Sequence, residues 1–424
     1  MSARRDIDDP ELLDTLERCY ELVREETSTN GQVTTASLLK RYLKRPVFEA
    51  LRYRLTRMDH NLLDVIWPGA KEVPEDADGD IDEELEEVIF RNGGVIAPDY
   101  ESYTVFSELL MPLVKDLHGH LVNYDLHPQP KSMFFLPDED DDENDDEEIK
   151  QKKGRVSKIN IDPSGKTVKS ARIECCRNIA DYQLPSGLSY AQLESLERDL
   201  VSALEACSGN QNKNKDDDDD EETKSYYAMT EILEENSEIK EMLEAENLLI
   251  TLSDEQENEE NLLHGPHWPH GRGVYVVKEA NLAIWINVQE HVRVLSSTPQ
   301  DNPGRLDGSY NKLAHLMVDL ETMFEFKRDP LLGYLTACPS MLGNTLHVNI
   351  IVHLPKLGQE EDNLKRLCSI REISLRRLSE GKDMFQLWNQ QSLSVTEHQT
   401  LTDFSTAASN IIQLEGNANR KFKK

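Results

Sequence analysis

The sequence contains no run of about 18 apolar residues, which is the length that a membrane-spanning helix requires. Its first residues, MSARRDIDDPELL, lack the apolar stretch of a secretory signal, and their acidic residues argue against a transit peptide. Cysteine is sparse, with six residues and no C-x-x-C pair. These absences predict a cytoplasmic protein with reduced thiols.

Basic residues are outnumbered, with 47 Lys and Arg against 80 Asp and Glu, so the formal net charge is −33. This balance argues against contact with nucleic acid or an anionic membrane. Much of the acid lies in runs at 72–87, 138–148 and 213–222. The segment at 72–87 is expected to loop over the surface. The Asp-rich runs at 138–148 and 213–222 lack the ligand spacing of an EF-hand loop, so we interpret them as solvated spacers, which could also dock a basic partner.

The order of periodic segments predicts the fold class. Residues 10–65 have helical apolar spacing, and an amphipathic helix follows GGVIAPDYESY. Further on, 159–176 is typical of a strand, a turn and a second strand, 273–288 of a hairpin, and 345–355 of a buried strand. Long helices are expected at 188–207, 310–326 and from Ser394 or Thr396 onward. We therefore expect an α+β protein: a helical domain at 1–130, an acidic linker at 131–155, and an antiparallel sheet flanked by helices at 156–424, with an acidic insert at 208–224.

Several segments, in order, resemble the phosphagen kinases, and most closely arginine kinase. They are SLLKRYLKRPVFEALRYRLT, GGVIAPDYESYTVFSELLMPLVKDLHG, INIDPSGKTVKSARIECCRNI, HWPHGRGVYVVKEANLAIWINVQEHVRVLS, LLGYLTACPSMLGNTLHVNIIVHLPKL and SVTEHQTLTDF. The resemblance implies a small helical domain and a larger sheet domain. It also implies reversible transfer of the γ-phosphoryl group of Mg-ATP to a guanidino nitrogen.

That reaction requires positive charge around the phosphates. The family carries two arginines one residue apart on a strand, and here the pair is Arg172 and Glu174. By resemblance, Arg172, Arg293 and His291 are candidate contacts to the nucleotide. The alternative is that Arg293, His291 and Arg272 make internal ion pairs that hold the sheet.

Other family positions have also changed. The resemblance assigns catalytic roles to Cys338 and Asp254, although a buried, inert thiol is an equal alternative for Cys338. A family arginine after the acid is replaced by Glu257, and another by His347. Ile351 stands where the family has a histidine beside adenine.

Two loops depart from the family pattern. The basic loop after LPKL is shortened, and Arg376, Arg377 and Glu380 are possible substitutes. The loop that holds the guanidino substrate includes Gly93, Gly94 and Ile96, with Arg91 at its start. A cation at Arg91 would repel a guanidinium group.

The segment HGPHWPHG places His264, His267 and His270 at three-residue spacing. This suggests a metal site, but prolines and glycines make it a loop without cysteine partners, and we predict no metal there.

Three hypotheses follow. The first is a catalytically impaired member of the family, kept for binding or assembly. The second is an active ATP:guanidino phosphotransferase with a rewired site, using Mg-ATP. The third is an acidic module for a basic partner, which is compatible with the first.

Overall fold

The structure of the chain is a computed structural model that describes residues 9–24, 36–70, 91–119, 128–136, 154–156, 158–209, 226–250, 264–378 and 381–421. The acidic runs at 72–87, 138–148 and 213–222, and with them Asp254, Glu257 and Glu380, lie outside these ranges.

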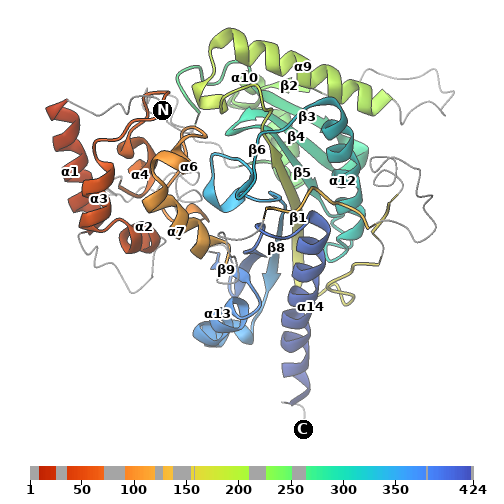
Figure 1. The fold of residues 1–424 in the computed structure, drawn as a ribbon. Coiled ribbons are helices and arrows are strands. Elements are labelled where there is room, and N and C mark those ends of the chain that lie inside the picture. Colours follow the sequence, from red (N-terminus) through yellow and green to blue (C-terminus); the bar gives the residue numbers. More distant parts are fainter. Residues whose placement is uncertain are drawn as a thin grey trace.

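A small domain of helices forms the N-terminal part, drawn in red and orange in Figure 1. Its helices are α1 (Pro10–Arg24), α2 (Ala36–Tyr42), α3 (Arg45–Leu51), α4 (Leu62–Ala70), α6 (Ser102–Val105) and α7 (Ser107–Leu117). Their apolar faces meet in one core that includes Leu16, Leu39, Phe48 and Leu110, all without exposed surface. Pro46 lies in the first turn of α3, as the sequence predicts.

The larger domain is built on a sheet whose strands are ordered β2-β3-β4-β5-β1-β8-β10-β9, with every neighbouring pair antiparallel. The strands are β1 (Val168–Arg177), β2 (Tyr226–Ala228), β3 (Gly273–Val277), β4 (Leu282–Val288), β5 (Glu290–Ser297), β8 (His347–His353), β9 (Ile373–Arg377) and β10 (Met384–Asn389). A separate ribbon joins β6 (Arg328–Asp329) to β7 (Gly333–Tyr334). This arrangement confirms the predicted fold class.

Helices cover the two faces of the sheet unequally. One face packs against α9 (Tyr190–Gly209), α12 (Asp307–Met323), α13 (Glu361–Ser369) and α14 (Glu397–Lys421) in the main core. On the other face, α10 (Met229–Ile232) and α11 (Glu238–Ala245) cover the part formed by β3, β4 and β5. Leu332, Leu335 and Leu342 of the large domain join the core of the small domain. Figure 1 shows the helical domain beside the sheet domain.

Local predictions are confirmed for the 273–288 hairpin, for α9 and for α12. The predicted strand before β1 is wrong, because Asn160 makes only an isolated bridge. Asp162 instead accepts hydrogen bonds from the backbone N–H groups of Ser164, Thr167 and Val168, which fixes a turn. No helix among the described residues is long and apolar enough to cross a membrane.

Candidate functional site

The central strand β1 carries different chemistry on its two faces. Arg172, Glu174 and Cys176 project to one face because side chains alternate along a strand. In the ladders, Glu174 is paired with Leu295 of β5 and with His347 of β8, so these side chains share that face. We call the face that carries Arg172, Glu174 and His347 the site face.

Glu174 forms a buried ion pair with the Nε of Arg293, and the carboxylate residue is only 3% exposed. Arg293 also donates from Nη1 to the Oε1 of Gln289, 3.2 Å away. Burial alone would raise the pKa of Glu174, but the charges of Arg293, Arg172 and Arg91 outweigh it and lower this pKa to about 2. An ionised carboxylate of the chain therefore stands among the arginines.

Arg172 lies beside this pair, and its guanidinium group is fixed by a hydrogen bond. Its Nη1 donates to the carbonyl of Leu249, 2.9 Å away, in the segment after α11. Arg91 comes from the small domain, where its guanidinium lies 5.9 Å from the centroid of the Trp388 ring. Trp388 is two strands away from β1, paired with Asn349 on the same face. The site face thus receives cations from both domains.

The two arginines of the shortened loop lie on opposite faces of the edge strand β9. Arg376 is paired with Gln386, which is on the site face, while Arg377 is paired with Phe385 of the main core. Arg377 donates to Glu361 at 2.8 Å and lies over the Phe385 ring. The structure therefore brings Arg376, and not Arg377, to the face that carries Arg172.

Cys338 lies in the segment before β8, packed with Cys176 and Met341 and 8% exposed. Burial, reinforced by the nearby charge of Glu290, raises the pKa of its thiol to about 12. Glu290 accepts from the backbone N–H of Ala337 at 2.9 Å and from the side chain of Asn178, and burial raises its own pKa to about 7. Cys338 is therefore a neutral thiol at physiological pH.

The segment that carries Cys338 joins the two domains. The carbonyl of Ala337 accepts from the N–H of Ala97 at 2.8 Å, and that of Thr336 from the hydroxyl of Tyr103 at 2.9 Å. His118, at the end of α7, lies 2.9 Å from the Pro339 carbonyl through its Nε2. The small domain is thus fastened to the segment at several points.

The predicted substrate loop also lies at this junction. Gly93 and Gly94 have φ values of 67° and 85°, which favour glycine. A Cβ on Gly69 of α4 would lie 2.8 Å from the carbonyl oxygen of Gly94, so backbone approaches backbone closely. Ile96 is buried against Leu184.

His291 has both ring nitrogens engaged inside the protein. Its Nδ1 accepts from the N–H of Ile179 at 2.9 Å, so its Nε2 is the donor to the carbonyl of Gln183, 2.7 Å away. Burial lowers the pKa of this imidazole to about 4. These contacts favour the alternative in which His291 holds the sheet.

Arg272 explains the arrangement of the three-histidine segment. It is 1% exposed and donates to the carbonyls of Asn287, His267, His270 and His264. The backbone of the segment therefore wraps around a guanidinium. Among the residues that the structure describes, no group of three or more His, Cys, Asp or Glu could hold a metal ion.

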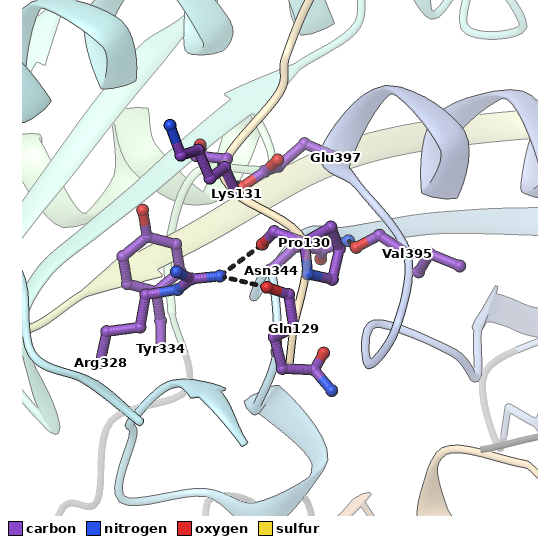
Figure 2. Close-up of a pocket in the computed structure, with 10 residues that line it drawn as sticks. Gln129, Pro130, Lys131, Arg328, Tyr334, Asn344, Val395 and Glu397 are labelled. Carbon is purple, nitrogen blue, oxygen red and sulfur yellow. Dashed lines mark hydrogen bonds between the residues drawn. The ribbon is translucent and has the colours of Figure 1, made fainter. Parts of the chain in front are cut away.

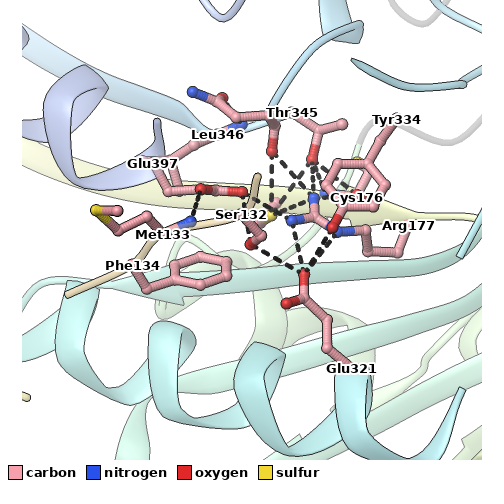
Figure 3. Close-up of polar contacts among 12 residues, drawn as sticks. Ser132, Met133, Phe134, Cys176, Arg177, Glu321, Tyr334, Thr345, Leu346 and Glu397 are labelled. Atoms are coloured by element: carbon pink, nitrogen blue, oxygen red, sulfur yellow. Dashed lines mark hydrogen bonds and ion pairs between the residues drawn. The ribbon is translucent and has the colours of Figure 1, made fainter. Parts of the chain in front are cut away.

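A polar network that the sequence does not predict lies on the opposite face of β1, centred on Arg177 (Figure 3). Arg177 pairs with Glu321 at 3.1 Å and with Glu397 at 3.0 Å, and its guanidinium lies 3.6 Å from the Tyr334 ring centroid. Glu397 also accepts from the hydroxyl of Ser132 and the N–H of Met133. Arg177 and Glu321 are 144 positions apart in the sequence, and Ser132 and Glu397 are 265 positions apart, so no local motif predicts these contacts.

A small pocket opens onto this network (Figure 2). It is lined by Gln129, Pro130, Lys131, Ser132, Arg328, Tyr334, Gly343, Asn344, Val395 and Glu397. Arg328 donates to the carbonyls of Gln129 and Pro130 and so ties the interdomain segment to the β6–β7 ribbon. The pocket lies on the side of β1 that carries Arg177, away from the site face.

Comparisons with known proteins match both parts of the chain. The family model described as "ATP:guanido phosphotransferase, C-terminal catalytic domain" matches residues 209–418. The model described as "ATP:guanido phosphotransferase, N-terminal domain" matches residues 34–115.

Curated relatives include an arginine kinase of Schistocerca americana, 27% identical over 388 residues, which cover 90% of this chain and 93% of that protein. A probable arginine kinase of Caenorhabditis elegans is 27% identical over 414 residues, covering 96% and 98%.

Two solved structures share the fold. The substrate-free duplicated taurocyamine kinase from Schistosoma mansoni superposes with a TM-score of 0.65 at 22% identity, over 94% of this chain, which spans about half of that longer protein (49%). A lombricine kinase superposes with a TM-score of 0.58 at 19% identity, over 92% of this chain and 97% of that one.

Proposed function

The chain belongs to the phosphagen kinase family of ATP:guanido phosphotransferases, and we propose that its phosphotransfer activity is impaired. In this proposal the protein is retained for binding or assembly. One observation carries the proposal: the carboxylate of Glu174 is ion-paired with Arg293 and lies among further arginines on the site face.

The chemistry of phosphoryl transfer explains why this arrangement impairs the reaction. ATP presents several negative charges, and transfer depends on fixed positive groups that stabilise charge in the transition state. A carboxylate in direct contact with Arg293 offsets that guanidinium and repels phosphate oxygens. The described residues of this face therefore do not fit the phosphates of Mg-ATP as they stand.

The state of Cys338 supports the same proposal. Its thiol has a pKa raised to about 12 by burial, so it supplies no thiolate to pair with a guanidinium group. Removal of one transition-state donor typically lowers a rate by about 10²–10³. Loss of both the positive charge around the phosphates and the thiolate is expected to remove useful turnover, although such effects are not additive.

Mg-ATP binding measured by calorimetry tests the proposal, with an active arginine kinase as the positive control. We expect affinity at least about 100-fold weaker than in the control, and no phosphotransfer to arginine in a coupled assay. Family-like affinity together with turnover would instead establish the alternative, an active ATP:guanidino phosphotransferase with a rewired site in which Arg376 supplies a replacement cation.

An acidic interaction module is a compatible second function, favoured by the surface of the α10–α11 segment. Glu234, Glu235, Glu238, Glu241 and Glu244 are all exposed there, between the acidic stretches of the sequence. A basic protein partner bound through this acid should dissociate as salt is raised. At 0.5 M salt the Debye screening length is roughly 4 Å. Binding of the partner that persists at this salt concentration and after deletion of 213–222 would contradict this role.

A further inference from the structure

The arginines of the site face are held as a set around one carboxylate. Arg293 on β5 contacts Glu174 directly, and Arg172 precedes Glu174 by two residues on the same face of β1. Arg91 reaches the same region from the small domain, close enough to act on the charge of Glu174. A cluster of cations around the buried carboxylate of Glu174 has the form of an anion site whose occupant is part of the chain.

The arginines nearest Glu174 have further contacts of their own. Glu174 is paired in the ladder with Leu295 and His347, and neither of these side chains carries a negative charge. Arg293 has a second fixed contact at Gln289, and Arg172 has one at Leu249. These contacts orient both guanidinium groups independently of Glu174.

We propose that Glu174 is the specificity-determining residue of the site face: it acts as an internal counter-anion that excludes polyphosphates, while the arginines around it remain competent to bind them. The inference rests on the proposed function and goes beyond it, since it states that the phosphate site is masked by one carboxylate. Neutralising Glu174 should therefore create affinity for an external anion without any added cation.

The test compares the wild type with Glu174→Gln and Glu174→Ala, using inorganic pyrophosphate as the probe in calorimetry. We expect at least about a tenfold gain in affinity in both variants, because a like charge next to the ligand is removed. The gain should disappear when Arg293→Gln is added to Glu174→Gln, since Arg293 would be the main contact.

The opposite face of β1 offers a matched control. Glu397→Gln removes an equally buried carboxylate from Arg177 and changes the net charge of the protein by the same amount. No gain in pyrophosphate affinity is expected there. An equal gain in Glu397→Gln would show a nonspecific charge effect and overturn the proposal.

Stability gives a second readout if the variants fold poorly. A ligand that binds only the folded state raises its unfolding temperature, so pyrophosphate should stabilise Glu174→Gln and not the wild type. Variants that stay unfolded even with pyrophosphate, or that fold but do not bind it, overturn the inference and leave the proposed function intact. Tight pyrophosphate and Mg-ATP binding by the wild type would overturn both.

Discussion

Arg177 and Glu397 form an ion pair 3.0 Å long in which neither side chain exposes any surface. The pair joins β1 to the first turn of α14, and Glu321 of α12 lies 3.1 Å from the same guanidinium. Three elements of the large domain are therefore tied together by charge inside the main core.

Glu397→Gln should destabilise the protein by about 3 kcal/mol, because the buried guanidinium of Arg177 would keep only one of its two carboxylate partners, Glu321. Urea unfolding measures the loss. Arg18→Gln is the control, since Arg18 pairs with Asp14 on the surface of α1 and its loss should change nothing measurable. Equal effects of the two substitutions would contradict a structural role for the buried network.

Cys338 should react much more slowly than Cys207 with iodoacetamide at pH 8. Its thiol is buried with a pKa raised to about 12, whereas Cys207 on α9 is partly exposed. Mass spectrometry of alkylated peptides from the folded protein gives the order of reaction. We expect Cys338 to react at least about tenfold more slowly than Cys207. Preferential labelling of Cys338 would contradict the inert thiol and support a reactive one.

His118 should make interdomain stability depend on pH. Burial lowers the pKa of its imidazole from 6.5 to about 4 in the folded protein, so the unfolded chain binds more protons between these pH values. Its contribution is fully present above pH 6.5 and is lost as pH falls towards 4.

Unfolding of the wild type and of His118→Gln at pH 7 and pH 5 measures this contribution. The advantage of the wild type should shrink by about 2 kcal/mol between these values, because the variant has no imidazole to protonate. Parallel stability profiles for the two proteins would show that folding does not shift the pKa of His118.

Gly69→Ala should destabilise the small domain by about 1–3 kcal/mol, since the added methyl group would lie 2.8 Å from the Gly94 carbonyl oxygen and from Leu39. Gly416→Ala in α14 is the matched helical control. No atom lies within 4 Å of the Cβ that would be added there. It should be neutral or stabilising by up to about 1 kcal/mol. If Gly69→Ala leaves the stability unchanged, the predicted substrate loop at Gly93 and Gly94 can shift to make room.

Periodicity was sufficient to predict those parts of the fold that local pattern determines. Alternation along β1 placed Arg172 and Glu174 on one face, and the alternating run at 273–288 gave the hairpin. The turn at Asp162 is predicted by the sequence, but the strand expected before it is not formed, because side-chain hydrogen bonds of Asp162, which periodicity does not register, fix the backbone there. Thr396 was one of two candidate starts for the last helix, and its hydroxyl does accept from the N–H of Gln399.

The candidate site could be predicted only in part. The sequence predicts an acid among cations, because Glu174 stands two positions from Arg172. It could not identify Arg293 as the partner of Glu174, which lies 119 positions away, nor separate Arg376 from Arg377 by face. The role of His291 depends on contacts with Ile179 and Gln183 that no spacing reveals. Asp254 lies outside the described residues, and its role stays a prediction.

The alternation along β1 also bears on how such a protein can change over generations. Glu174 and Arg177 are three residues apart, yet one belongs to the site face of β1 and the other to the opposite face. Substitutions on the first side can accumulate without weakening the second. A lineage can therefore lose its original chemistry and still inherit a stable scaffold, on which selection for a new task can act.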